Sequence, residues 1–250
     1  MTFRHLLCCG LLAAATGGAH AASIQFTAIN ADEDGWAVVT LQDITPGTTI
    51  YFTDNEWNGS AIGSGGAFNT GESYFQWASG ATAITAITAG TVIRFSAVDT
   101  TSLAATVGTL SRATVSGSTN YGISQSADTI YAYLGTAADT PTQFLAAIAT
   151  TTFSAAEGVI TSTGLTLGAT AIQLNIGTGG DYAEYTGART GQTTFAGYQS
   201  AVGNIANWNN PGDGNFASTE PNTTAFTVVP EPSAALIGGL GVFALIRRRR

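Results

Sequence analysis

Residues 44–52 read ITPGTTIYF, and this stretch predicts how the chain begins its strands. Pro46 and Gly47 occupy the central positions that a tight turn prefers, and the apolar residues after them predict a strand. A close copy, ITAGTVIRF, recurs at residues 87–95, and a weaker version lies within residues 165–174. Two good copies are too few for a solenoid, whose repeats stack at least three deep. We therefore interpret the copies as equivalent strand starts in one sheet system.

Short apolar segments separated by turns continue on both sides of this repeat. Residues 24–29 alternate apolar and polar side chains, as a half-buried strand does, and residues 36–41 predict another strand after an acidic turn. One helix is expected at residues 141–149, because Thr140 suits the N-cap and Pro141 suits the first helical position. Further strands are predicted at residues 129–134, 158–160 and 170–175.

This spacing of short strands and turns is typical of an all-β protein. We predict an immunoglobulin-like or related β-sandwich with one short helix, in a single domain over residues 23–228. Without its two ends the chain keeps about 200 residues, a length compatible with one larger all-β domain. Hydrophobic residues make up 44% of the chain, which is enough for a sizeable core.

The inventory of reactive side chains in the body is small. The chain has no lysine, and its two cysteines (Cys8, Cys9) and two histidines (His5, His20) all precede residue 23. This excludes thiol, imidazole and Schiff-base catalysis and zinc sites built from Cys and His from the body. Its three arginines face fifteen acidic residues, or sixteen with Glu231, so the body repels phosphate backbones and nucleic acid is not an expected partner.

The N-terminus has the layout of a secretory signal peptide. Arg4 precedes an apolar run over residues 6–15, and Ala19 and Ala21 frame a small-x-small cleavage site. We predict a signal-peptide helix within residues 1–22 and cutting by signal peptidase after Ala21 or the next alanine. The alternative is a short buried helix.

The C-terminus combines a proline-rich motif, an apolar run and a basic end. Pro230, Glu231 and Pro232 hold an extended, accessible segment, because proline stops both helices and strands. Residues 234–246 would form a helix of about 20 Å, short of the roughly 30 Å hydrocarbon core. The arginines that follow extend it by snorkelling and stay cytoplasmic. The tail therefore predicts a short transmembrane helix inserted transiently in the inner membrane, or else a permanent single-pass anchor. The terminal arginines are Arg247, Arg248, Arg249 and Arg250.

The three parts of this tail, over residues 229–250, resemble the PEP-CTERM sorting signal. The resemblance implies recognition by an exosortase-type processing enzyme and removal of the helix and the arginines. It also implies delivery to the surface or extracellular matrix of a Gram-negative cell. The same tail is sometimes named the C-terminal domain of ice-binding proteins, a label that identifies an address and does not imply ice binding.

The body more distantly resembles uncharacterised extracellular bacterial β-domains, which are similar to lamin-tail-type, immunoglobulin-like sandwiches. That resemblance implies a surface module and carries no catalytic residue to this chain. The residues that carry it are Phe26, Asn30, Asp34, Gly35 and the segments GTTIYFTDNEW (residues 47–57), GTVI (90–93) and DTIYAY (128–133).

The most polar cluster in the body lies at Asp54 and Glu56. On one strand these two carboxylates would point to the same face, about 7 Å apart. With Asp32 and Asp34 on a turn they predict an all-oxygen calcium site, and calcium is the one cofactor that the sequence suggests. The alternatives are a solvated acidic loop and the carboxylate pair of a glycosidase.

Trp57 follows this cluster directly. An exposed indole ring stacks well on a sugar, so Trp57 is a candidate glycan contact, with core packing as the alternative.

Three functions follow from these features. The first is an exported, non-enzymatic protein of the cell surface or the biofilm matrix, associated with exopolysaccharide. The second is a carbohydrate-binding module that depends on calcium. The third is a carboxylate-based glycan hydrolase, whose activity would be lost on Glu56→Gln.

Overall fold

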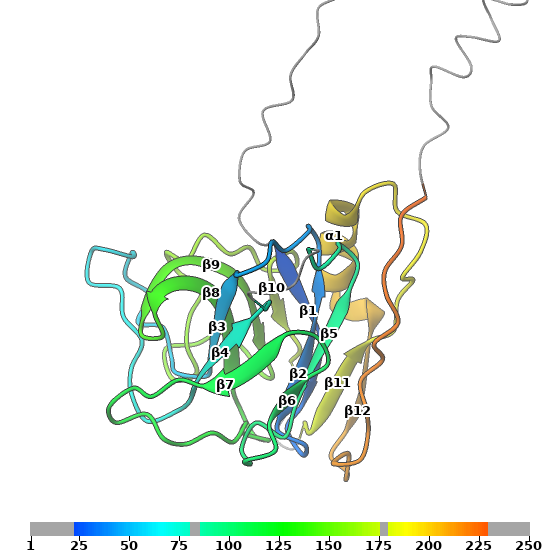
Figure 1. Cartoon of the computed structure of the whole chain (residues 1–250). Coiled ribbons are helices and arrows are strands. Elements are labelled where there is room, and N and C mark those ends of the chain that lie inside the picture. The colour runs from blue at the N-terminus through cyan, green and yellow to red at the C-terminus, as the bar shows by residue number, and fades with distance from the viewer. Residues whose placement is uncertain (1–22, 81–85, 176–179, 230–250) are drawn as a thin grey trace, which may run out of the picture.

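The computed structural model describes residues 23–80, 86–175 and 180–229, which form a mostly β body of two sheets (Figure 1). The predicted signal peptide with Ala19 and Ala21, and the predicted sorting motif and helix within residues 230–250, lie outside the described residues. Among the described residues no helix is long and apolar enough to cross a membrane.

The first sheet has six strands in the order β12-β11-β1-β2-β5-β6, with antiparallel neighbours. Hairpin β1–β2 forms its centre, and the acidic turn predicted after residue 29 joins the two strands. The strands are β1 (Ile24–Asn30), β2 (Gly35–Thr40), β5 (Val92–Ser96), β6 (Ala104–Ala105), β11 (Tyr182–Tyr185) and β12 (Trp208–Gly212).

The second sheet also has six strands, in the order β10-β9-β8-β3-β4-β7. All neighbours are antiparallel except β9 and β10, which run parallel. The strands are β3 (Thr49–Thr53), β4 (Tyr74–Ala78), β7 (Thr109–Arg112), β8 (Thr129–Ala137), β9 (Thr140–Ala149) and β10 (Ala171–Gln173).

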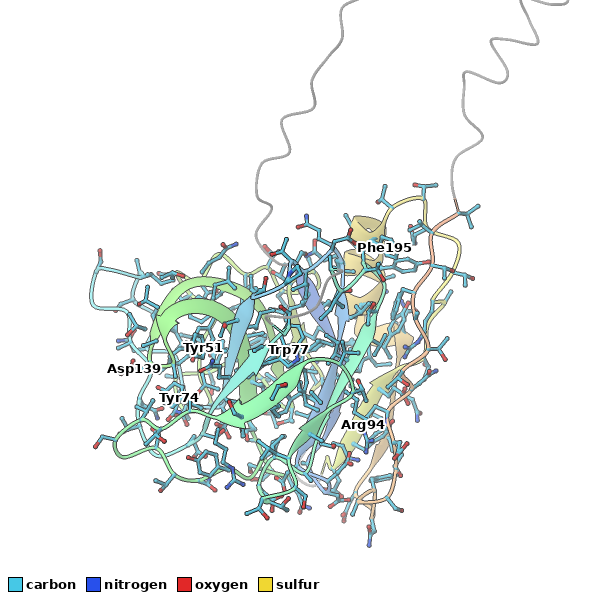
Figure 2. The ribbon with its side chains drawn as sticks, in the orientation of Figure 1. Tyr51, Tyr74, Trp77, Arg94, Asp139 and Phe195 are labelled. Carbon is cyan, nitrogen blue, oxygen red and sulfur yellow. The ribbon has the colours of Figure 1, made fainter. Side chains whose placement is uncertain are left out.

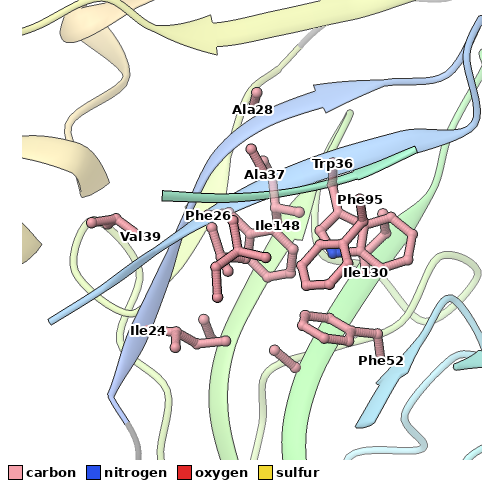
Figure 3. Close-up of a cluster of buried hydrophobic side chains, with 14 of the residues drawn as sticks. Ile24, Phe26, Ala28, Trp36, Ala37, Val39, Phe52, Phe95, Ile130 and Ile148 are labelled. Carbon is pink, nitrogen blue, oxygen red and sulfur yellow. The ribbon is translucent and has the colours of Figure 1, made fainter. Parts of the chain in front are cut away.

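The sandwich core between the two sheets is aromatic and buried. Phe52 of the second sheet lies 5.2 Å from Trp36 and 5.0 Å from Phe95 of the first sheet, measured between ring centroids. Ile130 and Ile148 of the second sheet belong to the same cluster (Figure 3). Interleaved rings from both sheets bury large apolar areas, and this burial is the main force that holds the layers together.

The two copies of the repeat begin side by side and then part. Ile44 and Ile87 exchange both backbone hydrogen bonds, at 2.8 and 3.0 Å. Gly47 (φ 79°) and Gly90 (φ 89°) make the same left-handed turn, which glycine adopts without strain. The copies then enter different sheets, as β3 and β5, so they are equivalent strand starts in two layers rather than in one sheet.

The helix predicted at residues 141–149 is wrong, because this segment is strand β9. It forms a hairpin with β8, and its side chains pack into two hydrophobic clusters. Leu145 and Ile148 enter the sandwich core, while Phe144 and Ala147 pack on the outer face of the sheet. A strand buries both faces in this way, and the gain overrides the helix propensity of the alanines.

The helix of the structure lies elsewhere. It is α1 (Tyr198–Gly203), between the 3₁₀ turns η1 (Phe195–Gly197) and η2 (Ile205–Asn207). Six residues are too few to show a helical repeat in a sequence. Residues 158–160, predicted as a strand, hold only an isolated bridge at Gly158.

Strand β1 is buried along its whole length, and not on alternate residues as predicted. One face meets the second sheet, and α1 packs on β1, with Tyr198 and Val202 joining the core. The polar residue Gln25 donates its amide to the Ala169 carbonyl (2.5 Å), so burial leaves that donor satisfied.

Candidate functional site

An acidic pocket of about 510 Å³ opens at one end of the second sheet. Strand β3 ends there and its antiparallel neighbours β4 and β8 begin there, so the loops around these strand ends meet. Three loops (residues 54–73, 113–128 and 150–170) supply the four carboxylates that line the pocket. These carboxylates are Glu56, Glu72, Asp128 and Glu157.

Asn55 and Asp54 join the two ends of the loop between β3 and β4. The Asn55 amide donates to the Ser73 carbonyl (2.9 Å), and its oxygen accepts the Glu72 N–H (3.1 Å). Asp54 Oδ1 accepts the N–H and the hydroxyl of Ser73, at 2.8 and 2.5 Å. These bonds hold the side chains of the loop in a fixed arrangement without a bound ligand.

Two carboxyl groups here are buried: Asp128, which lines the pocket, and Asp54, which lies behind it. Asp54 is 4% exposed, and its Oδ2 has no hydrogen-bond partner among the described residues. Burial raises the pKa of Asp54 to about 7, and the charge of Glu72 adds to the shift. Burial also raises the pKa of Asp128, and the charge of Asp54 raises it further. Near neutral pH this pair therefore holds a proton that ordinary aspartates would have lost.

Glu56 lies at the rim of this arrangement. Its Oε2 is buried and unpartnered among the described residues. Burial raises the pKa of Glu56, and the charges of Glu72 and Glu157 raise it further. A raised pKa favours the protonated carboxyl, which can donate a hydrogen bond to a hydroxyl group as well as accept one.

Asp32 and Asp34 do not join Asp54 and Glu56 in a metal site. Asp34 Oδ1 accepts the Ile123 N–H (2.5 Å), and Asp32 Oδ2 accepts the Phe216 N–H (2.6 Å). Burial, helped by the charge of Asp99, raises the pKa of Asp34 to about 6. The predicted calcium ligands thus tie separate loops together.

No group of three or more Asp, Glu, His or Cys side chains suited to a metal ion occurs within residues 23–80, 86–175 and 180–229. The structure therefore does not group the four predicted ligands: Glu56 lines the acidic pocket, Asp54 lies behind it, and the other two lie in the turn after β1.

Trp57 is a packing residue in the structure, only 2% exposed. Its ring meets Phe68 (5.1 Å) and Phe144 (4.9 Å) edge to face, in an outer aromatic cluster that also includes Tyr131 and Tyr133. A ring covered in this way offers no open face to a sugar, so the packing alternative fits the structure and the glycan contact does not.

Sequence reasoning placed Asp54 and Glu56 in a site but missed Glu72, Asp128 and Glu157. The missed residues are far apart along the chain, and Glu72 lies at the far end of the same loop as Asp54 and Glu56. The signal that would find them is strand pairing, since the order β9-β8-β3-β4 brings these segments to one edge.

A second feature is the strap, which we define as residues 222–229, the last described residues. The N–H groups of Phe226, Thr227 and Val229 donate to body carbonyls at 2.8 Å each. Arg189 donates to the carbonyls of Asn222 (3.1 Å) and Thr224 (2.8 Å), and its guanidinium lies over the Phe226 ring. The chain is therefore held to the body up to Val229.

Comparison with known proteins concerns the end of the chain. A family model described as the PEP-CTERM protein-sorting motif matches residues 228–250. The search of curated proteins and the search of solved structures each find no match. The strap thus leads directly into the matched segment, whose Pro230, Glu231 and Pro232 were predicted as the core of a sorting signal. The chain carries a PEP-CTERM sorting motif, which identifies it as an exported protein sorted by an exosortase.

Proposed function

We propose that the protein is a non-enzymatic component of the surface or extracellular matrix of a Gram-negative bacterium, associated with its exopolysaccharide. Signal peptidase would remove residues 1–22 and the exosortase would remove the membrane segment. The observation that carries the proposal is the sorting motif, which follows an acidic β body without an intervening linker.

The body suits a structural role outside the cell. Residues 23–229 contain no cysteine, so its stability does not depend on the redox state of its surroundings. Paired sheets with an aromatic core give that stability instead. An immunoglobulin-like strand arrangement is part of the proposal and is supported by the two facing, mainly antiparallel sheets.

Mass spectrometry of the protein recovered from fractions of its native host tests this proposal. We expect a surface or matrix fraction that contains a chain trimmed at both ends. A Pro230→Ala/Pro232→Ala variant should remain in the membrane fraction with its tail. Recovery of the full-length chain, leader and arginines included, from the cytoplasm would overturn the proposal.

The acidic pocket supports a second candidate, a glycan-binding module. It is large enough for a sugar ring, and its carboxyls suit hydroxyl groups. Binding to exopolysaccharide arrays should fall on Glu56→Gln and stay unchanged on Asp213→Asn, which removes one exposed charge outside the pocket.

The same assay separates the remaining alternatives. Loss of binding with a chelator would support the calcium-dependent form. Shorter glycan products that appear with the wild type and disappear on Glu56→Gln would instead favour the hydrolase. Equal binding by wild type and Glu56→Gln would remove the pocket from the proposal.

A further inference from the structure

The first and the last described residues, Ser23 and Val229, lie at the same end of the body. The Ser23 carbonyl, just before β1, accepts the Leu41 N–H (2.8 Å), and Val229 donates to the Gln192 carbonyl. Leu41 and Thr194 line one surface cavity between these two points. In Figure 1 the blue start of β1 and the red end of the described chain both lie on the side of α1.

We name this surface the tail end. It consists of Leu41, Asp43, Ala89, Thr194, Phe195 and Val229.

All but one of the side chains that make up the tail end are uncharged. Val229 is 54% exposed, one of three large hydrophobic side chains that are well exposed in the described part of the chain. Phe195 is half-buried and marks this end in Figure 2. Asp43 is the one charged residue here, and its carboxylate accepts the Ala89 N–H (2.8 Å). A surface with a single carboxylate is repelled less by anionic headgroups than a surface with several.

The acidic pocket lies at the opposite end. Strand β1 carries the chain about 20 Å from the tail end to the acidic turn at residues 31–34. There Asp34 bonds to Ile123, which lines the pocket. Tyr74, the neighbour of the Asp54 partner Ser73, lies toward that end in Figure 2. Anionic lipid headgroups repel a carboxylate-rich surface, so the acidic end is driven away from a membrane.

The distance from the strap to the sorting segment is short. Val229, the last described residue, is held by the body, and four residues separate it from the apolar run that starts at Ala234. Whatever their conformation, these residues span at most about 18 Å. A domain of about 200 residues has a diameter of about 43 Å. A tether shorter than half the body cannot bring the opposite end to the membrane.

We propose that the tail end faces the membrane while the protein is being sorted, and that it is the surface on which the membrane-embedded exosortase docks. The inference rests on the proposed function, since it takes the apolar run as the membrane segment. The proposed partner is an integral membrane enzyme, which must reach a site within a few residues of the folded surface. Lipid contact without enzyme contact is an outcome of the test.

Two matched cysteine variants test the proposal. Thr193→Cys places a thiol in an exposed loop at the tail end, and Thr101→Cys places one in an exposed loop beyond β5 at the acidic end. Neither threonine side chain makes a hydrogen bond to another described residue. A short photo-crosslinker on each thiol is activated in spheroplasts of a host with a catalytically inactive exosortase, which keeps the tail in place.

We expect crosslinks to the exosortase that are several-fold stronger from position 193 than from position 101. A twelve-residue Gly/Ser insertion between Val229 and Pro230 should reduce that difference, because the longer tether lets the body turn. Equal crosslinking from both positions, or crosslinks from position 193 to lipid alone, would overturn the inferred docking surface.

The controls separate this inference from the proposed function. The parent chain, which should have lost Cys8 and Cys9 with its leader, should take no label. In a host with active exosortase both variants should be trimmed like the parent. If the variants are trimmed but crosslink equally, only the inferred docking surface is contradicted. If the parent chain is never trimmed, the proposed function itself is contradicted.

Discussion

The sandwich core and the acidic pocket bury side chains of opposite kinds within the same sheet. Phe52 ends up between the two layers among other rings, while Asp54, two residues later, is equally buried but carries a titratable group. The core is assembled by strands, and the pocket by the loops that follow them.

This difference indicates which residues set the stability of the fold and which set its response to pH. Removal of apolar area from water stabilises the fold at every pH. A buried carboxyl stabilises it least when ionised, because its charge has lost its hydration. The core should therefore set the overall free energy of unfolding, and the pocket its dependence on pH.

The largest effect is expected for Phe52→Ala in the core. Loss of a ring that contacts both Trp36 and Phe95 should lower the free energy of unfolding by about 3–5 kcal/mol. Urea unfolding at pH 5 and pH 8 measures the change. Because no titratable group is touched, the loss should be equal at the two pH values, and a strongly pH-dependent loss would contradict the separation of core and pocket.

The sequence was informative about the core and poor at the pocket, for a physical reason. Residues 24–29, 36–41 and 50–53 show β patterns because each strand must bury its own side chains, and all three are strands in the structure. The all-β, two-layer body could thus be predicted from local patterns. The helix predicted at residues 141–149 is wrong because the strand partner of this segment cannot be recognised from its own sequence. The sheet that each copy of the repeat joins also depends on strand partners that the local sequence does not reveal.

The pocket depends on strand order alone. Asp54 and Glu56 were found because they are neighbours in the sequence. Asp128 was not found, because it meets them only after β8 pairs with β3. The burial of Trp57, which the sequence left open between glycan contact and core packing, depends on pairing in the same way, because Phe144, on the segment that was predicted as a helix, covers its ring.

The second prediction concerns Asp54→Asn. The pKa of Asp54 is about 7 in the folded protein and near 3.8 in the unfolded chain, so between these values the folded protein holds more protons. Stability then falls as pH rises through this window. Asparagine removes the charge and keeps an acceptor for Ser73, so it should gain roughly 2 kcal/mol at pH 8 and almost nothing at pH 4.

Thermal melting from pH 4 to pH 8 measures this effect. The wild-type melting temperature should fall across the series, and Asp54→Asn should flatten part of the slope. The rest of the slope belongs to the other carboxyl groups whose pKa values are raised, which are Asp128, Asp34, Glu56 and Glu33. If the variant keeps the full wild-type slope, Asp54 is not the group that titrates.

The third prediction is smaller and has the opposite sign. Ser73→Ala removes the hydroxyl that donates to Asp54 Oδ1 and leaves the backbone N–H in place. Because this hydroxyl stabilises the ionised form, the variant should lose about 1–2 kcal/mol at pH 8 and less at pH 5, where Asp54 is protonated. Urea unfolding at both pH values provides the internal control, and an equal loss would mean that the hydroxyl acts only as packing.

The smallest effect is expected for Glu72→Gln, which changes only the charge at the pocket wall. The Glu72 charge raises the pKa values of Asp54, Glu56 and Asp128 together. Its carboxylate accepts the Asn120 amide (2.8 Å), and glutamine can keep that bond. Carbon-detected NMR titration should therefore show all three pKa values lowered, with a gain of a few tenths of a kcal/mol at pH 8. Asp213→Asn, with the same change in net charge on an exposed loop, should leave the three titrations unchanged, so a common shift in both variants would assign the effect to net charge and not to the pocket.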